Sequence, residues 1–163
     1  MGDGVRIHYV EGGVPRATTT VLFVPGWSTS TAVWRDQMTA LASRARVVSI
    51  DPRSQGDSTI TVKSNTPEQR AKDLHEVIRS LRLANIVLVG WSQGVQDVAA
   101  YAAAFGGESI LGYVLVDSAI GSGAAAAVAK HDRRPTLARF NRPALIIAAA
   151  DSSEIEAQRE MSR

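Results

Sequence analysis

The chain has 163 residues, of which 45% are hydrophobic and 21% are charged, and it contains no cysteine. This composition excludes a wholly disordered chain. The missing cysteines exclude disulfide scaffolds, cysteine-based zinc sites, iron–sulfur clusters and a thiol nucleophile. The 18 Lys and Arg residues nearly balance the 16 Asp and Glu residues, so we expect no nucleic-acid partner. The length fits a single domain over residues 1–163.

The sequence carries neither a membrane span nor a secretory signal pattern. Its apolar stretches are all shorter than the roughly 18 residues that a spanning helix needs. The segment after Met1 begins an alternating pattern, where a signal would have a charged region followed by an apolar one. We therefore expect a cytoplasmic protein with no membrane partner.

Short apolar runs alternate with segments of helical spacing. In chain order, the pattern predicts strands at 5–10 and 19–24, a helix at 31–43, a strand at 46–50, a helix from 66 to about 83, a strand at 85–90, a helix at 95–105, strands at 110–116 and 144–150, and a helix at 153–161. Right-handed crossovers then give an α/β fold, a mostly parallel sheet with helices on both faces. Ligands of such sheets bind at the carboxyl ends of the strands.

The most specific motif is Gly90-Trp91-Ser92-Gln93-Gly94, a G-x-S-x-G pentapeptide between a buried strand and a helix. Such a turn holds its serine in a strained conformation, with the hydroxyl exposed above the sheet. The flanking glycines are needed because side chains would clash there. The motif predicts Ser92 as a nucleophile.

A serine nucleophile also needs two backbone N–H groups directed at the developing oxyanion. The residue after the nucleophile, Gln93, supplies one of them. The other is expected from the loop after the strand at 19–24, which reads Pro25-Gly26-Trp27. We assign this second N–H to Trp27.

A third motif follows the strand at 46–50. Residues 51–58 read D-P-R-S-Q-G-D-S, which has the form D-x-R-x-x-G-x-S. Together with P-G-W and G-W-S-Q-G in this order, it resembles the serine-nucleophile branch of the α/β-hydrolase superfamily, over roughly residues 4–161. The resemblance implies hydrolysis of a small-molecule ester or lactone through an acyl-enzyme, with no cofactor and no metal. It also implies a mainly structural role for Asp51 and Arg53.

Two positions depart from the family pattern. Ser54 stands where the family's D-x-R-G-x-G-x-S has its first glycine, and Pro25 stands where the oxyanion motif H-G-x has its histidine. P-G-W also resembles the cofactor-free dioxygenases of the same fold. An alternative function is therefore oxygenolysis of an N-heteroaromatic ring, with an aromatic substrate.

Two aspartates are candidates for the acid of a catalytic triad. Asp117 directly follows the strand at 110–116, and Asp151 directly follows the strand at 144–150. In the family the acid usually follows the later strand, which favours Asp151. Some members, including the dioxygenases, use the earlier position, which favours Asp117. The two remain alternatives.

The catalytic base is the missing part of the pattern. The family order is Ser, acid, His, yet no histidine follows Asp151. His8 is expected to be an exposed residue of an edge strand, and His75 to be a surface or boundary residue on the helix that starts at Thr66. His131, in a charged segment between the last two strands, is the remaining candidate base.

Three explanations fit the missing histidine. The chain is a fragment without the cap domain, the C-terminal strand and the histidine loop; or it is a minimised enzyme that uses His131 or an external base; or it is a non-catalytic ligand-binding relative. We favour the first, because the sequence stops inside a predicted helix. Truncation would expose a sheet edge through which a homo-oligomer can form.

Overall fold

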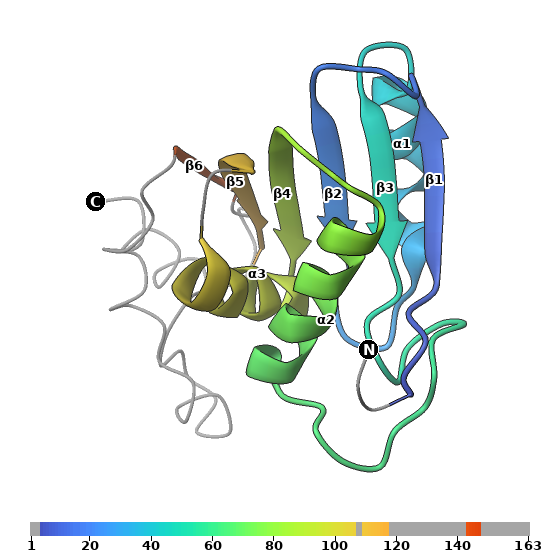
Figure 1. The fold of residues 1–163 in the computed structure, drawn as a ribbon, viewed down its shortest axis with the longest axis vertical. Helices are drawn as coiled ribbons and strands as arrows, with labels where there is room; N and C mark the ends of the chain where they lie inside the picture. The colour runs from blue at the N-terminus through green and yellow to red at the C-terminus, as the bar shows by residue number, and fades with distance from the viewer. Residues whose placement is uncertain (1–3, 107–108, 118–142, 148–163) are drawn as a thin grey trace.

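The computed structural model describes residues 4–106, 109–117 and 143–147. Within them, six strands form one sheet in the order β1-β3-β2-β4-β5-β6 (Figure 1). The strands are β1 (Tyr9–Gly13), β2 (Thr20–Val24), β3 (Arg46–Ile50), β4 (Ile86–Trp91), β5 (Ile110–Val116) and β6 (Ala144–Ile147). Five of them run parallel, and β1 pairs with β3 in the antiparallel sense. The expected mostly parallel α/β sheet is confirmed.

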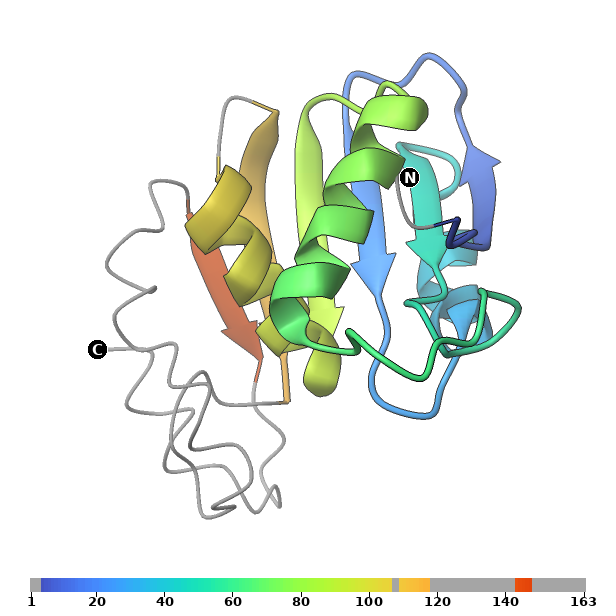
Figure 2. The same cartoon turned by 60° about the horizontal axis from the view of Figure 1, so that its bottom comes forward.

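Helices cover both faces of this sheet. They are the 3₁₀ turn η1 (Thr31–Trp34) and the helices α1 (Arg35–Leu41), α2 (Pro67–Ser80) and α3 (Gln93–Phe105). Figures 1 and 2 show α2 and α3 together on one face and α1 on the other. Among the described residues, no helix is both long and apolar enough to cross a membrane.

Alternate residues of β2 feed two separate cores, because successive side chains of a strand point to opposite faces. Leu22 belongs to the core under α2 and α3. Phe23 belongs to the core under η1 and α1, where its ring lies 4.8 Å from that of Trp34 between centroids. Every residue of β2 is buried. This central strand is therefore packed on both faces, and it fixes the point at which the next loop leaves the sheet.

The first strand lies later than the alternating pattern predicted, at Tyr9–Gly13 and not at 5–10. All of its residues are exposed, so no buried face fixes its register. Pairing with β3 does so, from Tyr9 opposite Ile50 to Gly13 opposite Arg46. Gly13 has a φ of 84°, and a side chain there would collide with the carbonyl oxygen of Ala45.

Helix boundaries follow their capping residues. Thr66 accepts a hydrogen bond from the Gln69 N–H at 3.3 Å, and Pro67 occupies the first turn, so α2 begins as predicted. The segment expected as one helix at 31–43 is η1 followed by α1. Helix α3 begins at Gln93, two residues before the predicted start. The helix predicted at 153–161 and the end of the strand predicted at 144–150 lie outside the described residues.

Candidate active site

Ser92 occupies the turn between β4 and α3. Its φ of 52° and ψ of −121° lie outside the conformations that an L-residue adopts freely. Such a residue persists only where its surroundings hold it. Here the Ser92 N–H donates to the carbonyl of Val116 at 2.9 Å, and the Ser92 carbonyl accepts from the N–H of Val95 at 3.0 Å. The turn is therefore a nucleophile elbow in its geometry as well as in its sequence.

The two glycines of the motif are required by close backbone approaches. A Cβ at Gly90 would lie 2.6 Å from the carbonyl oxygen of Gly94. A Cβ at Gly94 would collide with the carbonyl oxygen of Val24, at the end of β2. The absence of side chains lets the start of α3 pack directly against the strand end.

The loop after β2 lies against Ser92. A Cβ built at Gly26 would be 3.0 Å from the Ser92 Cβ, which places the following residue, Trp27, at the edge of the serine. Gln93 is the first residue of α3, and the N–H groups of a first helical turn have no acceptor within their own helix. The structure thus brings Ser92, Trp27 and Gln93 together at the carboxyl ends of β2 and β4, as predicted.

Asp117 follows β5 and lies level with Ser92. In the pairing of β4 with β5, Trp91 is opposite Val116, so the next residues along the two strands are neighbours. Asp117 has a φ of 49°, and its N–H donates to the carbonyl of Ile147 in β6 at 2.7 Å. Of the two candidate acids, the structure places Asp117 beside the elbow. Asp151 lies outside the described residues, as does the candidate base His131.

The two described histidines have other partners. His8 lies next to β1, and its Nδ1 is 2.8 Å from Oδ2 of Asp51. Its side chain is only 34% exposed, so the expectation of an exposed edge residue is wrong. His75 of α2 is half-buried and stacks on Phe105 of α3 with 4.2 Å between ring centroids, which fits the expected surface or boundary position. Neither ring is held by a contact with the elbow.

Asp51 anchors the loop after β3 to two other segments. Its Oδ1 accepts from the N–H of Thr31 at 2.6 Å, and its Oδ2 accepts from the N–H of Asp57 at 2.9 Å and contacts His8. The carboxylate is 1% exposed. Asp51 therefore fixes the segment after Trp27 that leads into η1, which agrees with the structural role expected for it.

His8, Asp51 and Asp57 are also the described residues that come closest to a metal site. Their ligand atoms all lie within 4.8 Å of one another. Both oxygens of Asp51 already accept backbone N–H groups. The hydrogen bonds of the Asp51 carboxylate therefore explain why these three residues cluster. They connect the N-terminal segment to the loop after β3.

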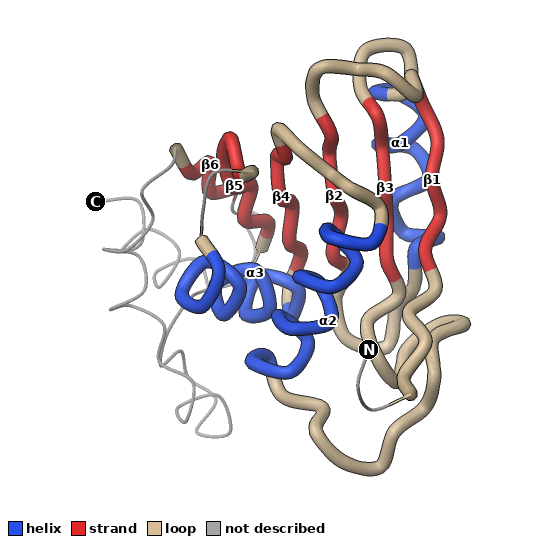
Figure 3. The backbone as a smooth tube through the Cα atoms, viewed as in Figure 1, coloured by secondary structure: helices blue, strands red, loops and turns tan. Residues whose placement is uncertain are grey.

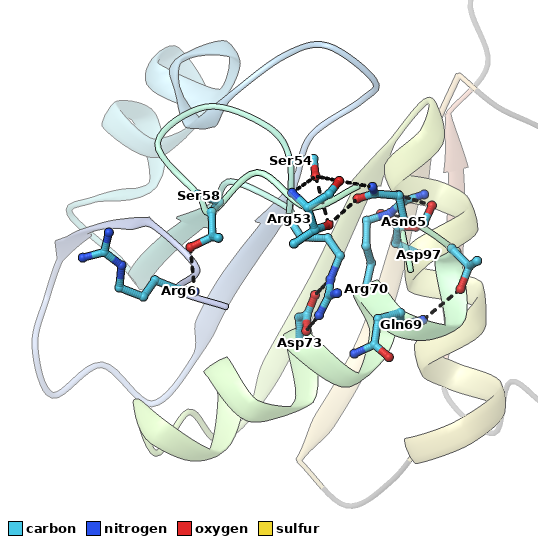
Figure 4. Close-up of polar contacts among 12 residues, drawn as sticks. Arg6, Arg53, Ser54, Ser58, Asn65, Gln69, Arg70, Asp73 and Asp97 are labelled. Carbon is cyan, nitrogen blue, oxygen red and sulfur yellow. Dashed lines mark hydrogen bonds and ion pairs between the residues drawn. The ribbon is translucent and has the colours of Figure 1, made fainter. Parts of the chain in front are cut away.

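Two buried ion pairs lie beneath the loop after β3 (Figure 4). Arg53 donates two hydrogen bonds to Asp73 of α2, from Nε to Oδ2 at 2.5 Å and from a terminal nitrogen to Oδ1 at 2.6 Å. Arg70 of α2 reaches Asp97 of α3 at 2.9 Å. All four side chains are about 5% exposed or less. The structural role expected for Arg53 is that of joining the loop to α2.

The sequence alone did not indicate the roles of Asp73, Arg70 and Asp97 in these ion pairs. It also did not indicate that His8 contacts Asp51. The signal available was charge on a buried helical face: Arg70 and Asp73 share the face of Leu74 and Val77. Charged residues are almost never fully buried unless they are paired. That rule indicates a paired charge at each position, although it does not identify the partner.

A buried tyrosine lies further along α3. Burial raises the pKa of Tyr101 to about 12, and repulsion from Tyr113 adds to the rise. The folded protein therefore holds this phenol proton to a higher pH than an ordinary tyrosine would. Tyr101 packs with His75 and Phe105, and this aromatic cluster joins α3 to α2.

A mostly parallel sheet with a strained serine between a strand and a helix is typical of the α/β-hydrolase fold. The sequence model of the family described as alpha/beta hydrolase fold matches residues 19–145, and the chain belongs to that family. The resemblance drawn from the motifs is thereby confirmed.

Individual curated relatives are esterases, haloperoxidases and epoxide hydrolases by name. The chain is 32% identical to a bifunctional esterase/perhydrolase of Acinetobacter calcoaceticus over 117 residues, which are 71% of this chain and 42% of that protein. It is 30% identical to the non-heme chloroperoxidase CPO-A1 of Kitasatospora aureofaciens, over the same shares of the two chains. The chain thus spans less than half the length of these curated relatives.

Solved structures agree on the fold. The bromoperoxidase of Bacillus anthracis has a TM-score of 0.86 at 21% identity, covering 96% of this chain and 83% of that one. The enol-lactonase of Burkholderia xenovorans LB400 also has a TM-score of 0.86, at 19% identity, covering 98% and 84%. At these identities the likeness shows the fold alone.

Proposed function

We propose that the protein is a serine hydrolase of carboxylic esters, with Ser92 as the nucleophile. The observation that carries this proposal is the φ of 52° at Ser92, in a turn whose two glycines permit the close packing. Strain of this kind, of order 1–3 kcal/mol, is typical of functional sites. The name of the esterase/perhydrolase relative supports the ester class.

In the proposed reaction, Ser92 Oγ attacks the ester carbonyl carbon and gives up its proton to a base. The carbonyl oxygen becomes an oxyanion, which accepts hydrogen bonds from the N–H groups of Trp27 and Gln93. Collapse breaks the bond to the alcohol, which leaves with a proton and leaves the acyl group on Ser92. Water then attacks the acyl-enzyme, releases the carboxylic acid and restores the serine hydroxyl.

The acid and the base complete the proposal. We assign the acid to Asp117, and the register of β4 and β5, in which Trp91 is opposite Val116, supports this assignment. Its role is to orient a histidine and to stabilise it once it is charged. Asp151 is the alternative acid and His131 is the candidate base of this chain.

The test is labelling with a fluorophosphonate, which reacts with an activated serine, followed by peptide mass spectrometry. The expected result is one adduct per chain, on Ser92, and none on the Ser92→Ala variant. Ser80→Ala, at the exposed end of α2, is the matched control and should label fully. A folded protein that gives no adduct would contradict the proposal and favour a non-catalytic ligand-binding relative.

A further inference from the structure

A groove runs beside the proposed oxyanion site. It has a volume of about 310 Å³ and is lined by residues 27–30, after β2, and residues 54–56, after β3. Figure 3 shows both loops leaving the same end of the sheet. Trp27 belongs both to the groove and to the proposed oxyanion site. A substrate whose carbonyl lies at Ser92 can therefore extend one of its two parts into the groove.

The lining combines polar and apolar surface and carries no charge. Residues 27–30 and 54–56 include no Asp, Glu, Lys, Arg or His. Four of them bear hydroxyls, namely Ser28, Thr29, Ser30 and Ser54. The neighbouring cation, Arg53, is buried in its pair with Asp73. A groove of this chemistry favours a neutral group with many hydrogen-bonding atoms over an ionised or purely apolar one.

Two of the hydroxyls, those of Thr29 and Ser30, keep unused hydrogen-bonding capacity, whereas Ser54 Oγ is occupied by three contacts with Thr61. Thr29 Oγ1 donates to the carbonyl of Gly26 at 2.8 Å, and Ser30 Oγ accepts from the N–H of Ala32 at 3.4 Å. A hydroxyl has one donor and two acceptor sites. Thr29 can therefore still accept a hydrogen bond, and Ser30 can still donate one.

Gln55 adds a buried amide to the same lining. Its side chain belongs to a residue only 8% exposed, and its Oε1 has no hydrogen-bond partner. Leaving such an acceptor unpaired costs about 1–3 kcal/mol. A hydroxyl of a bound molecule that donates to this oxygen supplies the missing partner and removes that cost.

The indole of Trp27 supplies an apolar surface. It is 62% exposed although it lines the groove. A sugar ring or a cyclic polyol has a face of C–H groups and an edge of hydroxyls. An exposed aromatic surface next to hydroxyl and amide groups matches both.

We propose that this groove binds a neutral polyhydroxylated group, a sugar or a cyclic polyol, and that the substrates of Ser92 are esters that carry one. The ester part rests on the proposed function, whereas the binding part does not. Gln55 is the residue that sets specificity, and Trp27 provides the surface on which the ring stacks.

The binding test uses the Ser92→Ala variant and methyl β-glucoside, with cyclohexylmethanol as the probe without ring hydroxyls. The indole N–H signals of the three tryptophans are followed by NMR, and Trp27→Phe identifies the signal of Trp27. The glucoside should shift that signal in a saturable way, and cyclohexylmethanol should bind more weakly. Absence of a saturable shift with the glucoside would overturn the inference.

A variant of the amide sharpens the test. Gln55→Met keeps the length of the side chain and removes its polar atoms, so it should weaken glucoside binding roughly threefold to tenfold. Gln37→Met, on the exposed face of α1, is the matched control and should bind like its parent. Equal binding by both variants would remove Gln55 from the proposal, and the titration of the parent still decides whether the groove binds sugars.

A comparison of substrates separates this inference from the proposed function. Wild-type protein is given methyl 6-O-acetyl-glucoside and cyclohexylmethyl acetate, and a higher kcat/KM is expected for the first. Ester turnover with no preference would contradict the groove proposal and leave the hydrolase proposal intact. Glucoside binding at Trp27 without any Ser92-dependent turnover would contradict the hydrolase proposal and leave sugar binding by the groove intact.

Discussion

The elbow at residues 90–94 and the loop at residues 51–58 leave the same end of one sheet, yet their polar groups differ in how they are used. In the loop, Asp51 is saturated by N–H groups and a histidine, and Arg53 is locked to Asp73. In the elbow, the backbone of Ser92 is held in a strained conformation by its neighbours. Position at a strand end therefore does not by itself indicate chemistry. Ser54 in the loop also has a positive φ, of 64°, so a left-handed backbone at a serine does not separate the two segments. The elbow differs in its ψ of −121° and in the two glycines that let β4 and α3 meet around Ser92, whereas the charged groups of the loop are paired internally.

The largest expected effect is on catalysis and concerns the elbow. Ser92→Ala should lower kcat/KM for a p-nitrophenyl ester by at least about 10³-fold, since only the oxyanion donors and binding remain. The free energy of unfolding should stay within about 0.5 kcal/mol of wild type, because the backbone is unchanged. Ester kinetics together with urea unfolding check both halves. Unaltered turnover would exclude Ser92 as the nucleophile.

The next effect is on stability and concerns the loop. Arg53→Met leaves the carboxylate of Asp73 buried without its partner, and should cost about 3–4 kcal/mol of unfolding free energy. The double variant Arg53→Met/Asp73→Leu should recover most of that loss, because it removes both charges. Urea unfolding measures each variant.

The exposed pair of Arg79 and Glu76 provides the control for this second prediction. Its side chains are 67% and 40% exposed, so Glu76→Gln should change the unfolding free energy by less than about 1 kcal/mol. If Arg53→Met were as mild as Glu76→Gln, the loop would owe little to its buried pair.

A smaller effect, of opposite sign, tests the strain itself. Ser92→Gly should raise the free energy of unfolding by about 1 kcal/mol, because glycine adopts a positive φ without a steric penalty. Ser80→Gly, at the end of α2, should lower it by roughly 0.5–1 kcal/mol. Thermal unfolding of the two variants side by side gives the comparison, and two losses of equal size would argue against strain at Ser92.

The prediction with the smallest effect on stability at neutral pH concerns Tyr101, in the helix α3 that follows the elbow. The folded pKa of Tyr101, about 12, is raised above its ordinary 10.0, so the folded state holds this proton more tightly than the unfolded state. The resulting stability is fully present below pH 10 and is lost as the pH rises towards 12. Tyr101→Phe should flatten the alkaline fall of unfolding free energy.

Tyr9→Phe, on the exposed strand β1, is the control for the alkaline prediction and should keep the wild-type pH profile. Circular dichroism during urea unfolding at several alkaline pH values gives both curves. An alkaline limb that is equally steep in Tyr101→Phe would show that another group controls it.

Much of the fold could be predicted because it depends on local patterns. Strand β5 has the predicted bounds, and α2 begins at the predicted cap, since hydrophobic period and capping chemistry are read within a few residues. The elbow was predictable for the same reason: its glycines and serine are contiguous in the sequence. Strand β1 was placed too early in the chain. Both of its faces are exposed, so its hydrophobic pattern does not show which residues pair with β3.

The unpredicted contacts join residues far apart in the chain. Arg53 and Asp73 are 20 positions apart, and Asp51 and His8 are 43 apart. Only the packed fold determines such pairs. The acid alternatives, the base and the expected dimerisation edge stay predictions, as does oxygenolysis of a heteroaromatic ring. An oxygen-uptake trace with a hydroxyquinolone would test the last of these.

One chain of backbone hydrogen bonds links the elbow to the edge of the described sheet. The Ser92 N–H is bonded to Val116 in β5, and the N–H of the next residue in that segment, Asp117, is bonded to Ile147 in β6. Fraying of β6 would therefore free the end of β5 and then the serine turn, in that order. Amide hydrogen exchange at Ser92 should consequently report on the opening of strand β6.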